Sequence, residues 1–415
     1  RVFQRLLGND RRWYDASSSE HNRRARARPT EVRGMKMTKS VIGSVAMEFS
    51  DEQAMLLDVA REFCRNKSPM DVVRLNLETD TGYDSAVWRE MVDLGWAGIA
   101  LPESVGGAGL GVGAVVPVME AMGRALLGTP LLTTTLAGQL LARAGGAHAE
   151  PHLAKIAAGT VATVAHLESA DWGSESCFAT IDDNGVLDGK KVFVADAGVA
   201  DIFVVVVSAD GNPALAIVTR EQLAADAVQM NTLIDLTKRS GKVDFSGVTV
   251  NADALITGPA VVSALRDFRL LGALLVAAEA TGAAASCLDT VVDYLKTRKQ
   301  FGKLIGSYQA LKHPTVDILC SVDTSRSFVY HAATLVDDKA LSEDAEVACR
   351  MAKAQATDTI EYAGDRAVQF HGGIGFTWDC DAQLFIRRAQ WVRQAFGDAI
   401  HHRKRLANSL LDQFL

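Results

Sequence analysis

The sequence lacks the cysteine spacing that metal sites and redox pairs need. Its six cysteines are scattered, no two of them form a CxxC pair, and no histidine cluster accompanies them. A zinc site or a reactive dithiol requires closely spaced ligands, so the pattern predicts free thiols in a reducing compartment and no metal site. The cysteines are Cys64, Cys177, Cys287, Cys320, Cys349 and Cys380.

An excess of positive charge and a long uncharged apolar stretch are also missing. The chain has 43 Lys and Arg against 50 Asp and Glu, a formal net charge of -7, which argues against nucleic acid as the main partner. The most apolar segment, 270–287, contains Glu279 and is rich in small residues. We therefore predict a core helix there, not a membrane span. Without a recognisable export or lipidation motif, the expected compartment is the cytoplasm.

The N-terminal segment does not resemble the rest of the chain. Residues 1–34 carry nine Arg against four acidic residues and show no apolar period. A mitochondrial presequence would be poor in acidic residues. We expect 1–46 to be a disordered tail, or the product of a start site placed too early, with Met47 as a plausible true start; a functional tail is the alternative.

Apolar periodicity divides the remaining chain into three parts. Residues 47–160 have helical spacing, 161–257 hold short β-branched runs between turn residues, and 258–415 hold long helical segments. The predicted fold is α+β but mainly α: an N-terminal helical domain, a middle β domain and a C-terminal four-helix bundle. The expected helices are 49–65, 85–101 (ending near residue 95), 116–127, 261–297, 308–337, 342–370 and 379–413, and the strands lie within 190–219 and 241–250.

Two glycine-rich breaks between the predicted bundle helices carry ligand-binding chemistry. In RKQFGKLIGSYQ (298–309), Arg298 can place a forked cation on a phosphate, and Gln309 can hydrogen-bond a polar ligand. In QFHGGIGFTW (369–378), the glycines allow a backbone to pass close to a ligand. Each break taken by itself is also explained as an ordinary interhelical turn.

Together the two breaks resemble the acyl-CoA dehydrogenase family, which has RxxFGxxIxxxQ after a long helix and QxxGGxGFT some 60 residues later. The resemblance covers nearly all of 48–413. LGWAGIALPESVGGAGLG (94–111) looks like the N-terminal segment and loop of the family, and DGKKVFVADAGVADIFVVV (188–206) looks like its β-domain run.

This resemblance implies an FAD enzyme that oxidises an acyl-CoA thioester to its α,β-enoyl product and passes electrons to an electron-transferring flavoprotein. In the family a base removes the α-proton while flavin N5 takes a β-hydride. It also implies a dimer or tetramer, formed with itself or with a paralogous subunit, because the second break meets the FAD of a neighbouring subunit. The implied FAD contacts are Arg298, Phe301, Gln309, Gln369, Gly372 and Gly373.

The chain departs from the family at the catalytic positions. The usual base is a Glu in a Tyr-Glu-Gly-Thr stretch, which falls on FGDA (396–399), so Gly397 replaces the Glu and Asp398 follows it. The alternative Glu of some relatives falls on Gly272. The Thr whose hydroxyl bonds the flavin falls on Ala195. Gly272 and the neighbouring Ala273 also remove bulk, which predicts a roomy pocket for a branched or polycyclic acyl group.

Three interpretations follow. Asp398 is the base, shifted by one residue, as an Asp serves in the related nitroalkane oxidases. Alternatively, the chain is a base-less subunit of a hetero-oligomer whose partner supplies the chemistry. In the third interpretation Asp398 only caps the last helix, and the chain uses its flavin otherwise, for example as an oxidase that uses O₂.

Overall fold

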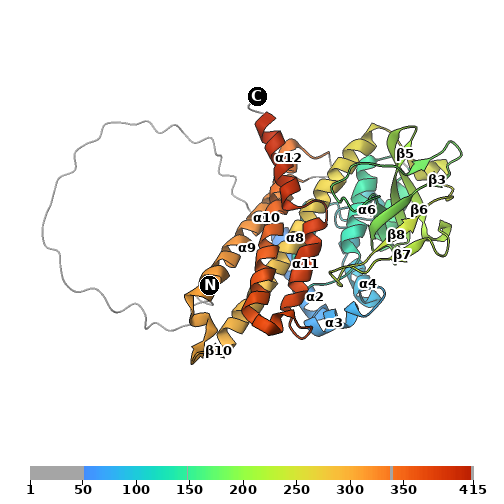
Figure 1. The fold of residues 1–415 in the computed structure, drawn as a ribbon. Coiled ribbons are helices and arrows are strands. Elements are labelled where there is room, and N and C mark those ends of the chain that lie inside the picture. The colour runs from blue at the N-terminus through green and yellow to red at the C-terminus, as the bar shows by residue number, and fades with distance from the viewer. Residues whose placement is uncertain (1–50, 147, 337–339, 413–415) are drawn as a thin grey trace, which may run out of the picture. The chain divides into compact units, whose positions relative to one another are not determined.

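The computed structural model describes residues 51–146, 148–336 and 340–412. The tail expected at 1–46 lies outside the described residues. Over the described ranges the chain runs through helices, then strands, then helices again, which confirms the predicted fold class (Figure 1).

The first part of the chain is helical, and its helix ends follow the local sequence. In α4 (Ser85–Asp93), the Asp84 carboxylate accepts a hydrogen bond from the Ala86 backbone N–H, and Gly95 then turns the chain with φ of 78°. The helix therefore ends near residue 95, as expected, and short 3-10 turns follow. The other helices of this part are α2 (Asp51–Lys67), α3 (Met70–Leu77), α5 (Val115–Arg124), α6 (Leu131–Ala144) and α7 (Glu150–Ala157).

The strands between α7 and α8 form two sheets that lie beside α6 (Figure 1). In the larger sheet, β5 (Ile202–Ala209) pairs along its length with β6 (Asn212–Thr219) and also with β1 (Ala162–Ala165), and its valines are buried on both faces. The three-stranded sheet holds β4 (Lys190–Ala195), β8 (Ser240–Asp244) and β7 (Val228–Met230). Shorter strands are β2 (Thr180–Ile181), β3 (Leu187–Asp188) and β9 (Leu255–Ile256).

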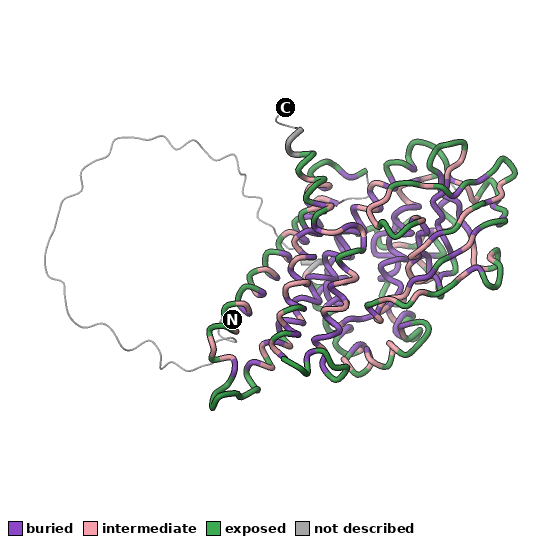
Figure 2. The backbone as a smooth tube through the Cα atoms, viewed as in Figure 1, coloured by how far each residue is buried: buried purple, intermediate pink, exposed green. Residues whose placement is uncertain are grey.

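Helix α8 (Pro259–Thr297) is the central element of the C-terminal bundle. It packs on α9 (Gln309–Leu335), α10 (Glu343–His371) and α11 (Ala382–Gln394), and also on α5 and α6 of the N-terminal part. The helix is long and apolar enough to cross a membrane, but 94% of its most apolar window is buried within the protein. The burial supports the predicted core helix, and Figure 2 shows the same buried interior along the bundle.

The last predicted helix, 379–413, is wrong as a single element, because the chain forms α11 and then α12 (Ala399–Asp412). Phe396 and Gly397 between them have φ of 56° and 93°, values in the left-handed region that a helix cannot continue through. The Lys353 ammonium group of α10 fixes this break by donating to the carbonyls of Val392 and Gly397, each at 2.8 Å. Contacts from a distant helix thus set the break.

Candidate functional site

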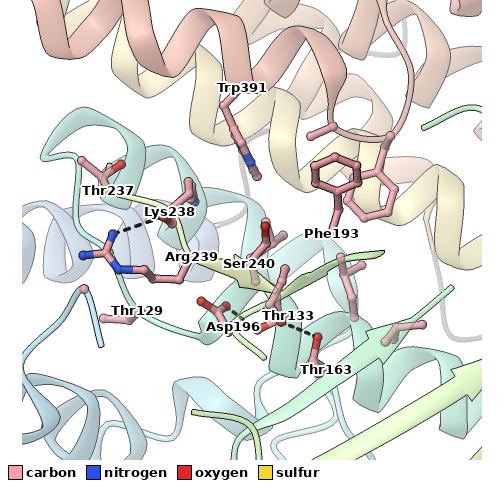
Figure 3. Close-up of a pocket in the computed structure, with 18 of the residues that line it drawn as sticks. Thr129, Thr133, Thr163, Phe193, Asp196, Thr237, Lys238, Arg239, Ser240 and Trp391 are labelled. Atoms are coloured by element: carbon pink, nitrogen blue, oxygen red, sulfur yellow. Dashed lines mark hydrogen bonds between the residues drawn. The ribbon is translucent and has the colours of Figure 1, made fainter. Parts of the chain in front are cut away.

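A pocket of about 920 Å³, including its open mouth, lies where α6, β1, β4 and the C-terminal end of α11 meet (Figure 3). The loop before β8 and the segment before α4 complete its walls. In Figure 3, Trp391 points into the pocket from α11, while Asp196, Thr133 and Thr163 lie on the opposite side. The pocket therefore has two different walls. The aromatic wall includes Phe268, Phe396 and Trp391, and the polar wall includes Thr133, Thr163 and Asp196.

The aromatic wall occupies the place where the family's catalytic groups were expected. The Phe396 ring stacks on His166 at 6.1 Å and meets Phe268 edge to face at 5.6 Å. A Cβ added at Gly272 would lie 2.4 Å from Phe396 Cε1, so this ring fills the space that the missing side chain leaves. The Phe396 ring therefore takes the room that was expected at Gly272.

His166 is the titratable group of the aromatic wall. Burial, together with the nearby positive charge of Arg269, lowers the pKa of His166 to about 3. The imidazole is consequently neutral at physiological pH, and it contributes a flat, uncharged surface to the pocket.

Asp196 is the titratable group of the polar wall. It follows β4 in the left-handed conformation, with φ of 52°, and its Oδ2 accepts a hydrogen bond from the Thr133 hydroxyl at 2.8 Å. The Asp196 side chain lines the pocket, and protein atoms surround most of its carboxyl group. Burial raises the pKa of Asp196 to about 6, although the hydrogen bond from Thr133 opposes the shift.

The cations beside the polar wall are bound by the protein itself. Lys238 Nζ lies 2.6 Å from Glu279 Oε1, and the fully buried Arg388 donates to the same oxygen at 2.6 Å and to Asp235 Oδ2 at 2.5 Å. The Arg239 guanidinium donates to backbone carbonyls, among them that of Thr79 at 2.7 Å. These contacts join the loop before β8 to α3 and α8, so they stabilise the pocket wall.

Asp398 does not line the pocket. Its Oδ1 accepts a hydrogen bond from the His401 backbone N–H at 2.7 Å, which is the N-cap geometry of α12. The predicted capping role is confirmed, and the role of Asp398 as a base stays a prediction. A side chain at Gly397, the position of the family's Glu, would meet the His401 ring, since an added Cβ would lie 2.8 Å from His401 Cδ2.

The six residues expected to contact FAD lie at the other end of the bundle, where β10 appears in Figure 1. Arg298, Phe301 and Gln309 come from the turn with strands β10 (Lys299–Gln300) and β11 (Lys303–Leu304) and from the start of α9. Gln369, Gly372 and Gly373 come from the end of α10 and the 3-10 turn after it. All six are exposed, and Phe301 is 91% exposed.

The two regions differ in how well they suit FAD. At the bundle end, the exposed Arg298 offers a guanidinium for a phosphate, and around Gly372 and Gly373 an added Cβ would meet nothing within 4 Å. In the pocket, Ala195 supplies no hydroxyl, and its carbonyl already accepts from Thr163 at 2.6 Å. The exposed Arg298 at the bundle end is therefore chemically suited to a phosphate of the cofactor. The pocket does not supply the expected hydroxyl for the flavin ring.

Three titratable side chains in and near the pocket were not singled out in the sequence: His166, Asp196 and the buried Lys353. A polar residue in the turn directly after β4 was a signal for Asp196, since loops carry a large share of binding residues. No local signal marked Lys353, because its role depends on carbonyls of another helix.

Comparisons with known proteins identify the family. The sequence matches the N-terminal domain of acyl-CoA dehydrogenases over 50–160 and their C-terminal domain over 266–411. The "Acyl-CoA dehydrogenase IpdE2" of Mycolicibacterium smegmatis is 31% identical over 86% of this chain and 98% of its own length. The protein of the same name from Mycobacterium tuberculosis is 29% identical over 83% of this chain and 92% of its own length.

Solved structures show the same fold. A structure described as the Tcur3481-Tcur3483 steroid ACAD variant has a TM-score of 0.77 at 26% identity, covering 87% of this chain and 98% of its own. The ChsE4-ChsE5 complex from Mycobacterium tuberculosis has a TM-score of 0.78 at 24% identity, covering 88% and 98%. The chain belongs to the acyl-CoA dehydrogenase family of flavin oxidoreductases. Members of this family depend on FAD and act on acyl-CoA thioesters.

Proposed function

We propose that this chain is a base-less subunit of a hetero-oligomeric, FAD-dependent acyl-CoA dehydrogenase. The complex introduces an α,β double bond into a thioester with a branched or bulky acyl group and passes the electrons to an electron-transferring flavoprotein. It works in the cytoplasm. A partner chain supplies the carboxylate base, and this chain supplies an interface and part of the cofactor site.

The observation that carries the proposal is the position of Phe396. Its ring lies against Gly272, one of the two places where relatives carry the base, while Gly397 stands at the other. The nearest carboxylate in the sequence, Asp398, caps α12. An α-C–H bond is a weak acid, and its removal requires a base within about 3 Å, directly or through one water. No carboxylate borders the aromatic wall of the pocket among the described residues.

The chain's contribution to the cofactor is at the bundle end. Arg298 would bind a phosphate through its fork of N–H donors, and Gln309 and Gln369 would hydrogen-bond polar groups of the dinucleotide. When bound, FAD would supply the hydride acceptor for the acyl group. The side chains at this end are exposed in the single chain, which suits a cofactor shared with a second subunit.

The comparisons support an assembly of two different chains. The descriptions of both solved neighbours name two components, Tcur3481 with Tcur3483 and ChsE4 with ChsE5. The alternative function is a homo-oligomeric dehydrogenase, or an oxidase, in which Asp398 leaves its capping position and acts as the base.

The test is to purify the tagged chain from its native cells, identify what copurifies with it, and measure flavin per chain by absorbance near 450 nm. The flavoprotein is then mixed anaerobically with acyl-CoA thioesters of short, long, branched and ring-bearing acids. Asp398→Ala is measured beside the wild type.

We expect a complex with a second acyl-CoA dehydrogenase chain, about one flavin per pair of chains, and bleaching that Asp398→Ala leaves intact. A flavin-bearing homo-oligomer whose bleaching disappears in Asp398→Ala would overturn the proposal and make Asp398 the base. Reoxidation by O₂ as fast as by an electron-transferring flavoprotein would favour the oxidase.

A further inference from the structure

We propose that residues 169–176, which we call the lid, open and close as one unit beside the pocket, and that an ion pair between Glu175 of the lid and Arg405 of α12 holds them closed. The inference goes beyond the proposed function, because it concerns access to the pocket and no step of the dehydrogenation.

The lid forms part of the pocket wall and then reaches α12. It belongs to the segment between β1 and β2, where no helix or strand forms among the described residues. Trp172 of the lid lines the pocket, and its ring lies 5.3 Å from that of Phe193 on β4. The next residue, Gly173, lies against α12, since an added Cβ would be 3.2 Å from His401 Nδ1. Outward movement of the lid would therefore widen the pocket beside α12.

The two ends of the lid are fixed to each other and to the β part of the chain. Glu168, directly before the lid, accepts hydrogen bonds from the backbone N–H groups of Phe178 at 2.6 Å and Ala179 at 2.8 Å. The fully buried Lys191 donates to the same carboxylate at 2.5 Å. A loop whose ends are joined in this way can turn as a compact unit about two fixed points.

The hydrogen bonds of the lid are almost all internal. Asp171 accepts from the backbone N–H groups of Gly173 and Ser174, through its side chain at 3.0 Å and through its carbonyl at 3.1 Å. Two serine hydroxyls of the lid accept from N–H groups two residues further on, at 3.2 Å each. Within the described ranges, the bond from Arg405 to Glu175 is the one hydrogen bond that joins the lid to the rest of the protein. Opening therefore breaks one exposed bond and leaves the turns of the lid intact.

The ion pair that holds the lid is weak, and a second arginine lies near it. Arg405 Nη2 is 3.1 Å from Glu175 Oε1, and the two side chains are 47% and 56% exposed. An ion pair this open to water and salt contributes little to stability. Burial lowers the pKa of Arg269 on α8, and the charge of Glu175 opposes that shift, so the carboxylate also faces this arginine. The closed state is therefore favoured only slightly over the open one.

The other walls of the pocket are held more firmly. Arg239 donates to several backbone carbonyls of the segment 76–80, and the fully buried Arg388 binds Asp235 Oδ2 and Glu279 Oε1. Breaking the contacts of Arg388 would leave buried charges without partners, which is costly. The lid has no comparable anchor among the contacts of the described residues, so it is the part of the wall that can move.

The first test measures how often the lid leaves the wall. Chymotrypsin must take the Trp172 side chain into its own apolar pocket before it cuts after this residue, so it cuts an open lid and not a closed one. When opening and closing are fast, the cutting rate follows the open population. The variants are Arg405→Gln, Glu175→Gln and the two combined, made in the full chain and tested in the assembly that it forms. Arg403→Gln is the matched control, because Arg403 is an exposed arginine of the same helix that pairs with Asp358.

We expect Arg405→Gln to speed cleavage after Trp172 by about two- to fivefold. Glu175→Gln should speed it at least as much, because this change also takes the carboxylate away from Arg269. The combined variant should resemble Glu175→Gln alone, since the two side chains act as a pair. The control, Arg403→Gln, should be cut like the wild type.

The second test asks whether the lid controls access to the pocket. Ser240 is buried and lines the pocket, so Ser240→Cys places a thiol inside it. The reaction of this thiol with a maleimide is followed by mass spectrometry in the wild-type, Arg405→Gln and Arg403→Gln backgrounds. Labelling in the Arg405→Gln background should rise by the same factor as cleavage. The exposed Cys320 is the reference for the reagent, and the buried Cys287 reports unfolding.

Equal cleavage of the wild type, the ion-pair variants and the control would overturn the inference, because the ion pair would then not hold the lid. Faster cleavage with unchanged labelling of the introduced thiol would overturn it as well, since the segment would then be a surface loop that does not control the pocket. An introduced thiol that is labelled in no background would count against it in the same way. Neither test measures flavin or bleaching, so the failure of this inference is distinguishable from the failure of the proposed function.

Discussion

At the scale of single residues, the buried carboxyl of Asp196 should make the stability of the chain depend on pH. Its pKa is about 6 in the folded chain and about 3.8 unperturbed, so the folded state keeps the proton longer and stability falls as pH rises through this range. The charged or titratable groups facing it are Lys238, Arg239, Glu279 and Tyr83. Asp196→Asn should gain about 1–3 kcal/mol more over the wild type at pH 7 than at pH 4.

Urea unfolding at both pH values, with Asp201→Asn as the control, measures this difference. A gain that is the same at pH 4 and pH 7 would mean that the carboxyl is not held in the environment described here.

A second residue-scale prediction concerns Asp398. Because its side chain caps α12, Asp398→Ala should lower the free energy of unfolding by about 1 kcal/mol, while Asp398→Asn, which keeps the capping oxygen, should cost only a few tenths. Thermal melts of both variants give the comparison. If both variants melted like the wild type, the cap would carry no stability, and a separate role for the carboxylate would gain weight.

At the scale of elements, the break between α11 and α12 should tolerate change poorly. Gly397→Ala places a Cβ at φ of 93° and 2.8 Å from His401, so it should cost about 1–3 kcal/mol. Gly373→Ala is the matched control, since an added Cβ there meets nothing within 4 Å and its φ is not positive. The measurement is the urea midpoint of the two variants. An equal loss in both would show that the break is not specifically strained.

The same break shows what sequence reasoning could and could not reach. The long helices of the bundle and the strands within 190–219 followed from apolar periods and turn residues, because those signals are local. A helix end at 394 did not follow, since Lys353 from α10 donates to the carbonyl of Gly397 and His402 Nε2 lies 2.9 Å from Phe396 O. The polar wall was equally out of reach, because Asp196 and Thr133 meet only after α6 packs beside the strands.

At the scale of the whole molecule, the proposed function divides the work of a flavoenzyme between this chain and a partner chain. Among the described residues, the aromatic wall of the pocket has no carboxylate and Ala195 supplies no hydroxyl for the flavin, whereas the bundle end presents Arg298 and exposed glycines. Assembly and cofactor binding are therefore expected to stabilise each other, as any ligand that binds only the assembled state does.

This division predicts the effect of Arg298→Ala in the assembled complex. Loss of one charge-assisted hydrogen bond to a phosphate should weaken FAD binding by about 10- to 100-fold. Arg393→Ala is the matched control, because this arginine is also exposed but pairs with Glu361 on the neighbouring α10. Flavin retained after gel filtration and the FAD dissociation constant are measured for both. If Arg298→Ala retained flavin like the control, the cofactor would have to be held entirely by other residues, and the bundle end of this chain would serve assembly alone.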